Sequence, residues 1–246
     1  MKSYRQELYD SYVRVQVPTW AAPDATADKV WARATLWRLQ DWLPRDNMAR
    51  CLDVGCGAGH LLAALRSAGY TAVSGVDVGP EAAKIAGSKG LNVTQADLRD
   101  FLRRSPETFD LICAFDVIEH FHKDELLDVL RLVRERLKPG GILILQTPNA
   151  LSPWAGHYRY DDLTHELIFS PKSIRSTLRL TGFGNVQVRE IRPYAHGLKS
   201  VLRCCLWKLI WGGCALWNLA ETGSAQGGVY SRNMLVRAVK EDPLRW

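Results

Sequence analysis

Cys-x-x-Cys pairs are missing from this sequence. Its 246 residues include six cysteines, none of them in a Cys-x-x-Cys pair, and Cys51, Cys56 and Cys113 lie in or beside predicted strands. Disulfide frameworks and structural zinc sites both depend on such spacings, so the sequence indicates neither. Unpaired cysteines are typical of a reducing compartment, and we therefore expect a cytoplasmic protein.

Long uninterrupted apolar runs are also missing. The first residues are polar, and no apolar segment of the secretory type follows them, so we expect no secretory signal. The most apolar segment, residues 201–220, is interrupted by Arg203, Lys208, Gly212 and Gly213. A membrane-spanning helix needs ~20 cleanly apolar residues, which excludes a span here.

The charge has no concentrated pattern. A formal net charge of +6 would suit an acidic partner, but the arginines of the second half are spread thinly and no nucleic-acid-binding motif accompanies them. We expect no nucleic-acid partner. An apolar share of 47% over this length suits one α/β domain with additions rather than two domains.

The most informative segment that is present covers residues 51–60, which read Cys-Leu-Asp-Val-Gly-Cys-Gly-Ala-Gly-His. Its three glycines let the chain turn sharply off a strand and bring the backbone close to a ligand, in front of a helix with free N–H groups. A dinucleotide-binding loop would need glycine where His60 stands. The carboxylate of Asp53 suits a cationic ligand better than a diphosphate.

Acidic residues also follow the next predicted strands. Asp77 follows a strand at residues 71–76, where a carboxylate can bind both hydroxyls of a ribose. Asp97 follows a short strand at residues 92–95 and is either a ligand or a helix N-cap. Asp116 follows the strand Phe109–Phe115 and begins the run Asp-Val-Ile-Glu-His. The carboxyl ends of parallel strands share one edge, so we expect one crevice to collect these carboxylates.

Taken in order and spacing, these four segments resemble the motifs of class I S-adenosylmethionine-dependent methyltransferases. The resemblance implies an α/β fold: a Rossmann-like, seven-stranded, mostly parallel sheet with helices on both faces and a helical insertion between the last two strands. It also implies S-adenosylmethionine as the cofactor. The residues expected to bind it are Asp53, Gly55, Cys56, Gly57, Gly59, Asp77, Val78, Asp97, Leu98, Phe115 and Asp116.

We expect a single domain built from several segments. Residues 1–45 form an N-terminal helical cap, irregular over residues 8–23 and helical over residues 28–43. Residues 49–191 and 229–240 form the core, with the sixth strand at residues 186–191 and the seventh within residues 229–239. Residues 192–228 form the helical insertion.

The insertion offers three interpretations. Its tryptophans and basic residues suit an interfacial helix on the cytoplasmic face of an anionic membrane, or a homodimer contact through residues 199–220. The third is a helical hairpin packed on the protein's own core.

Histidines are few, and two of them are candidates for catalysis. Methyl transfer from a sulfonium is an in-line displacement, and an alcohol nucleophile must lose its proton, a task suited to histidine near neutral pH. His165 lies on the loop expected over residues 147–170, where Asp162 or Glu166 could hold its tautomer. His120 is the second candidate. A metal held by His120, His165 and a carboxylate stays open, but no tight ligand spacing supports one, so no metal-binding residue is assigned.

Residues 159–166, Arg-Tyr-Asp-Asp-Leu-Thr-His-Glu, resemble a run in bacterial methyltransferases associated with polysaccharide and lipopolysaccharide synthesis. That resemblance implies O-methylation of a sugar hydroxyl in a surface glycan, or in its lipid-linked or nucleotide-activated precursor. The substrate-binding residues would be Arg159, Tyr160, Asp162 and Glu166.

Two further functions stay open. Residues 116–120 also resemble enzymes that methylate quinone-type phenols, whose acceptor pocket should be apolar. A non-catalytic cofactor-binding partner in a biosynthetic complex is the other, and it predicts degraded binding residues, whereas Asp53, Gly55, Gly57 and Asp77 are intact.

Overall fold

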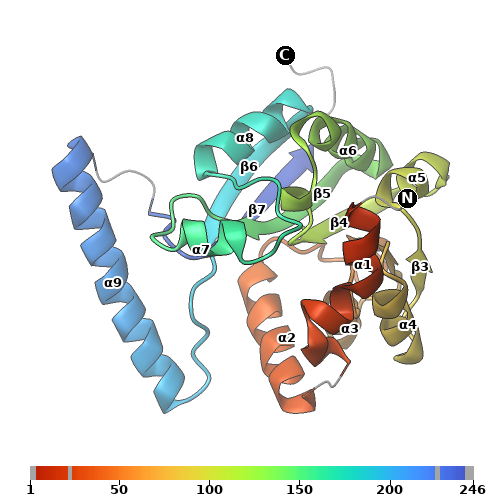
Figure 1. The fold of residues 1–246 in the computed structure, drawn as a ribbon, viewed down its shortest axis with the longest axis horizontal. Coiled ribbons are helices and arrows are strands. Elements are labelled where there is room, and N and C mark those ends of the chain that lie inside the picture. The colour runs from red at the N-terminus through yellow and green to blue at the C-terminus, as the bar shows by residue number, and fades with distance from the viewer. Residues whose placement is uncertain (1–3, 22–23, 225–227, 242–246) are drawn as a thin grey trace.

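The computed structural model describes residues 4–21, 24–224 and 228–241. Its centre is a seven-stranded sheet in the order β3-β2-β1-β4-β5-β7-β6 (Figure 1). All neighbours are parallel except β7, which runs antiparallel to both β5 and β6. The expected fold class is confirmed. The strands are β1 Cys51–Val54, β2 Val73–Asp77, β3 Val93–Gln95, β4 Phe109–Phe115, β5 Leu137–Pro148, β6 Phe183–Glu190 and β7 Asn233–Lys240.

Helices cover both faces of this sheet because its central strands are apolar on both sides. On β4, Ile112 and Ala114 share a buried cluster with α5 (Leu98–Arg104), α6 (Lys123–Arg136) and α8 (Pro171–Leu180). Leu111 and Cys113 share the opposite cluster with α2 (Ala25–Leu39), α3 (His60–Ser67) and α4 (Pro80–Ser88). This alternation fixes the register of the sheet between its two helical layers.

The N-terminal segment is more helical than expected. It forms α1 (Tyr4–Val15), the short 3-10 helix η1 (Pro18–Trp20) and α2. The expectation of irregular chain over residues 8–23 was wrong for the part within α1. Only Val13 of α1 is buried, so the usual apolar stripe is missing from its sequence. The side chain of Asp24 caps α2 by accepting the N–H groups of Thr26 and Ala27.

The segment after β5 is also more ordered than expected. Residues 147–170 contain the short helix α7 (Ala155–Tyr160), where we expected only loop. The chain then runs beside the 3-10 helix η2 (Ile118–His120), where the carbonyl of Glu119 accepts the N–H groups of Glu166 (2.8 Å) and Leu167 (2.9 Å). These bonds bring the two histidine-bearing segments together.

The insertion is a single helix, α9 (Leu198–Thr222), which lies beside the domain rather than over the sheet (Figure 1). The expected alternative of a helical hairpin was therefore wrong. Of the α9 residues, only Ser200 is buried. Across the described ranges, no helix is long and apolar enough to cross a membrane.

Candidate active site

A cavity of about 1100 Å³ opens at the carboxyl ends of β1, β2 and β4. This is the switch point of the sheet, where the chain order runs outward in both directions and ligands of such folds bind. The volume is at the upper end for ligand sites, enough for a nucleoside-sized cofactor and a small acceptor. The cavity contains the following expected cofactor residues in its wall: Asp53, Gly55, Cys56, Gly57, Asp77, Val78, Asp97, Leu98, Phe115 and Asp116.

Two of the three glycines in the loop, Gly55 and Gly57, line the cavity and let a ligand come close to the backbone. Gly55, Gly57 and Gly59 have φ values of +65°, +53° and +80°, which favour glycine. A Cβ on Gly57 would stand 2.5 Å from Cη2 of Trp20, so the indole covers the loop directly. Gly59 is absent from the cavity wall, and a Cβ there would strike the side chain of Leu91. Gly59 therefore serves the packing of α3.

Asp77 is held in place by the same loop. Its two carboxylate oxygens accept the N–H groups of Gly57 and Gly79, each at 2.7 Å. Each oxygen keeps a lone pair toward the cavity, as a ribose diol requires. Asp97 caps α5 through the N–H groups of Arg99 and Asp100, and it also lines the cavity, where its role as a ligand stays a prediction.

Asp53 is a buried acid at the floor of the cavity, with 3% of its surface exposed. Burial, with the negative charge of Asp77, raises its pKa well above the usual value. A ligand with a positive charge would offset this cost. These observations fit a cationic, ribose-bearing cofactor.

Asp116 has an unusual backbone for a residue with a side chain. Its φ is +54°, and its carboxylate accepts the amides of Gln146 (2.6 Å) and Asn233 (3.1 Å). Such strain is held in place by surrounding contacts and is common at functional sites. Here it aims the carboxylate into the cavity, where the enclosing walls raise its pKa.

The two candidate histidines lie side by side. The ring centroids of His120 and His165 are 4.9 Å apart at an interplanar angle of 60°. Nδ1 of His165 donates to the carbonyl of Tyr158 at 2.7 Å, so Nε2 keeps its lone pair. The expectation that Asp162 or Glu166 holds this tautomer was therefore wrong, because a main-chain oxygen does so.

Of these two histidines, His120 lines the cavity, whereas His165 is not part of the described cavity wall. The ring nitrogens of His120 lie 3.2 Å from the carbonyl of Thr164 and 3.1 Å from that of Asp116. Burial, aided by the positive charge that His165 can carry, lowers the pKa of His120 to about 4. The imidazole is neutral at physiological pH. The base role of His165 stays a prediction.

The expected substrate-binding residues hold the loop rather than line the cavity. Arg159 donates to the carbonyls of His165 and Glu166, and Tyr160 is 81% exposed. Asp162 accepts from Tyr12 and Thr164, and Glu166 accepts from Tyr4 and lies 3.4 Å from Nδ1 of His122. Their contact with a substrate stays a prediction.

Four aromatic side chains of the N-terminal segment form a roof over the cavity, and none of them was among the expected site residues. Tyr9, Tyr12, Trp20 and Trp31 come from α1, η1 and α2. The rings of Trp20 and Trp31 each lie 6.0 Å from that of His60, at the start of α3. The available signal was the density of aromatic residues before the glycine loop.

Residues 27–188 match a family model described as a methyltransferase domain. The chain belongs to this methyltransferase family. Its sheet order is that of a class I S-adenosylmethionine-dependent domain, so S-adenosylmethionine is its cofactor, and the cavity collects most of the residues expected to bind it.

Curated relatives share part of the sequence. A ubiquinone biosynthesis O-methyltransferase of Xylella fastidiosa is 37% identical over 164 residues, which are 60% of this chain and 61% of that protein. One of Xanthomonas campestris pv. campestris is 36% identical over 107 residues, 41% of this chain and 44% of that protein. The chain thus spans about half the length of these relatives.

Solved structures share the fold. An S-adenosylmethionine-dependent methyltransferase of Archaeoglobus fulgidus has a TM-score of 0.65 at 19% identity, covering 97% of this chain and all of that chain. Phosphoethanolamine N-methyltransferase 2 of Haemonchus contortus, bound to S-adenosyl-L-methionine, has a TM-score of 0.63 at 16% identity. The match covers 95% of this chain and 60% of that chain.

Proposed function

We propose that the protein transfers the methyl group of S-adenosylmethionine to a hydroxyl of a small, largely apolar acceptor of the quinone-type phenol class. The observation that carries this proposal is the aromatic composition of the cavity wall contributed by the N-terminal segment. Tyr9, Tyr12, Trp20 and Trp31 form a roof of aromatic rings. Such a wall suits a flat apolar ring.

A glycan acceptor needs a different wall. The polar residues expected to bind it, at positions 159–162, are absent from the described cavity wall. The names of the curated relatives support the phenol class as well, since they are ubiquinone biosynthesis O-methyltransferases. We therefore place the phenol acceptor ahead of the sugar acceptor.

The chain's own residues supply position and charge for this reaction. S-adenosylmethionine, when bound, supplies a methyl group on a positively charged sulfur. The carboxylates of Asp53 and Asp77 would hold the cofactor's cationic and ribose parts, and the N-terminal helices would exclude water. An acceptor hydroxyl at the cavity wall would lie beside His120, and His165, whose ring is next to that of His120, is the proposed general base.

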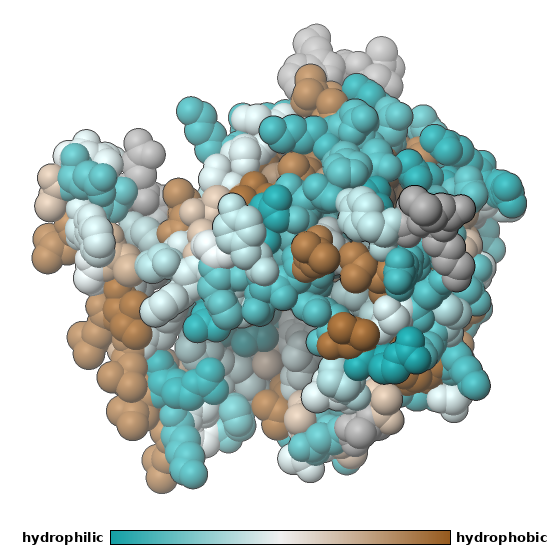
Figure 2. Space-filling view, in the orientation of Figure 1, coloured by the Kyte–Doolittle hydropathy of each residue, from teal (hydrophilic) through white to brown (hydrophobic). Residues whose placement is uncertain are grey.

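Helix α9 would bring the protein to such an acceptor at an anionic membrane surface. Leu198, Leu202, Leu209 and Leu216 recur on one face and are exposed, and Figure 2 shows this hydrophobic strip along the helix. Lys199, Arg203 and Lys208 are the charged residues of α9 before Glu221. Exposed leucines with basic neighbours on a helix that carries no acidic residue before Glu221 fit an anionic leaflet.

An acceptor panel tests the function. Purified protein with S-adenosylmethionine would be assayed against phenols that carry apolar tails of increasing length and against nucleotide-activated sugars. We expect kcat/KM to rise with tail length and the sugars to be inert. Turnover of sugars alone would overturn the proposal and restore the glycan acceptor.

A further inference from the structure

A buried carboxylate beside the cavity has an oxygen without a partner. Glu119 on η2 has no exposed surface. One carboxylate oxygen accepts the hydroxyl of Thr147 at 3.1 Å, whereas Oε1 has no hydrogen-bond partner among the described residues. An unsatisfied carboxyl oxygen in the interior is costly, and it indicates a missing cationic or donor group.

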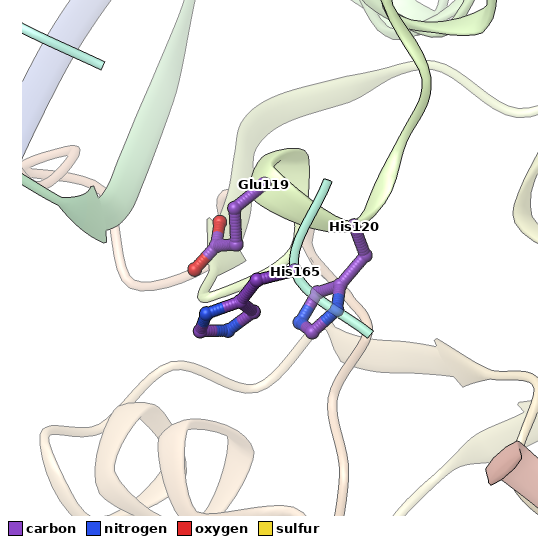
Figure 3. Close-up of side chains that lie close together, drawn as sticks. All are labelled: Glu119, His120 and His165. Atoms are coloured by element: carbon purple, nitrogen blue, oxygen red, sulfur yellow. The ribbon is translucent and has the colours of Figure 1, made fainter. Parts of the chain in front are cut away.

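Two imidazoles face the same space. Glu119, His120 and His165 each offer one ligand atom, and these atoms all lie within 4.8 Å of one another. Figure 3 shows the three side chains converging, from η2 and from the segment after α7. His165 donates from Nδ1 to the carbonyl of Tyr158, which leaves Nε2 available as a ligand.

From this convergence we infer that Glu119, His120 and His165 bind a divalent transition-metal ion, of which Zn²⁺ is the representative. Two imidazoles and a carboxylate suit such ions, whereas Mg²⁺ and Ca²⁺ prefer sets made of oxygen. The ion would be the missing partner of Glu119 Oε1. Metal–ligand bonds of about 2.0–2.2 Å place two ligand atoms at most about 4.4 Å apart, so small side-chain shifts close the site.

The surrounding contacts resemble the support that metal ligands need. The hydroxyl of Thr147 holds the second oxygen of Glu119, and the carbonyl of Tyr158 fixes the tautomer of His165. His120 must give up one of its two carbonyl contacts, to Asp116 or to Thr164, to present a lone pair. A neutral imidazole can donate to only one of them in any case.

Three protein ligands leave an open coordination position, and His120 places it at the cavity wall. An acceptor hydroxyl bound there would lose its proton more easily, because the cation stabilises the oxygen anion. This role in acceptor binding rests on the proposed function. Metal binding itself does not.

Titration of metal-free full-length protein with Zn²⁺, followed by calorimetry and by metal analysis after dialysis, tests the inference. We expect one ion per chain for the wild type and affinity lowered roughly 10- to 100-fold or more in Glu119→Gln and His165→Asn. His157→Asn is the matched control, since this exposed histidine of α7 lies outside the cluster, and it should bind like the wild type.

Cofactor affinity provides the folding control. Each variant should bind S-adenosylmethionine like the wild type, and Glu119→Asp, which keeps the charge, replaces Glu119→Gln if that variant fails to fold. Wild-type protein that binds no ion, or Glu119→Gln that binds as tightly, would overturn the inference. Phenol methylation that continues in metal-free protein overturns the metal's role but leaves the proposed function intact. Ion binding without phenol methylation would overturn the proposed function and leave the metal site intact.

Discussion

Tyr12 on α1 donates a hydrogen bond of 2.9 Å to Asp162, a residue 150 positions later in the chain. Asp162 also accepts the N–H and the hydroxyl of Thr164, the residue directly before His165. Burial alone would raise the pKa of Asp162, but the hydrogen bonds from Thr164 and Tyr12 outweigh it and lower the pKa. The helix over the cavity and the histidine loop are therefore one connected unit.

Tyr12→Phe should loosen this unit. The variant leaves the ring in the cavity roof and removes one hydrogen bond to a carboxylate, a bond of about 1.5–3 kcal/mol. Because only part of this energy is linked to ligand binding, we expect affinity for S-adenosylmethionine to fall roughly 3- to 10-fold by calorimetry. Tyr160→Phe, at an exposed tyrosine of α7, is the control. Equal cofactor affinity in Tyr12→Phe and Tyr160→Phe would contradict the prediction, because it would show that the bond from Tyr12 to Asp162 does not contribute to cofactor binding.

Asp53→Asn should stabilise the ligand-free protein while it weakens cofactor binding. The folded-state pKa of Asp53 is raised, so the protonated form is stabilised and stability is lost as pH rises through that pKa. Removal of the charge should increase the free energy of unfolding near pH 7 by an amount on the order of 1 kcal/mol. Urea denaturation at pH 5 and pH 8 measures this. A less stable variant at pH 8 would contradict the account.

Cofactor affinity should fall as the solution becomes acidic. A cationic ligand binds the ionised form of Asp53, and the raised pKa makes protonation compete at mildly acidic pH. The raised pKa of Asp77, caused by burial, acts in the same direction. Calorimetry from pH 8 to pH 5 should show a loss of affinity in the wild type. Asp53→Asn should bind weakly with a shallower pH dependence.

Gly57→Ala should damage the cofactor loop specifically. Alanine at φ +53° is strained, and its Cβ would displace the indole of Trp20. We expect cofactor affinity to fall at least roughly tenfold, the equivalent of about 1.4 kcal/mol. Gly87→Ala on α4 is the matched control, because nothing lies within 4 Å of a Cβ there. Thermal unfolding should show the control as stable as the wild type or more so.

Leu209→Glu combined with Leu216→Glu should abolish attachment to anionic lipid vesicles. Both leucines are exposed on the same face of α9, at 73% and 66%. Wild-type protein should co-sediment with vesicles rich in anionic phospholipid and weakly with zwitterionic ones. Leu180→Glu on α8, which is also exposed, is the control. If the wild type were a dimer and the double variant a monomer, α9 would serve self-association instead of membrane attachment.

The sequence was most informative where one local pattern determines both structure and chemistry. The run of buried residues Phe109–Phe115 predicted β4 with its exact bounds, and the alternate glycines predicted the loop and the cavity beside it. The insertion was also located, although its glycines suggested an interrupted helix. Gly212 and Gly213 lie within α9, and no atom outside the helix backbone lies within 4 Å of a Cβ at either position.

The remaining features depend on contacts between distant segments. Helix α1 has few apolar residues, because its inner side is made of tyrosines that bond to the histidine loop, as Tyr12 does to Asp162. From the sequence, the polar residues of the run 159–166 were expected to bind substrate. In the structure, Arg159 and Asp162 make hydrogen bonds within the protein instead. Nothing in the local sequence distinguishes these two uses of a polar side chain.

Transfer of labelled methyl from S-adenosylmethionine to a catechol-type phenol with an apolar tail, by wild type and by His165→Ala, tests the central claim most directly. The account predicts label in the organic extract with the wild type and a roughly 100-fold or greater loss in the variant, with cofactor binding retained. Label confined to a glycan fraction, or full activity in the variant, would contradict it.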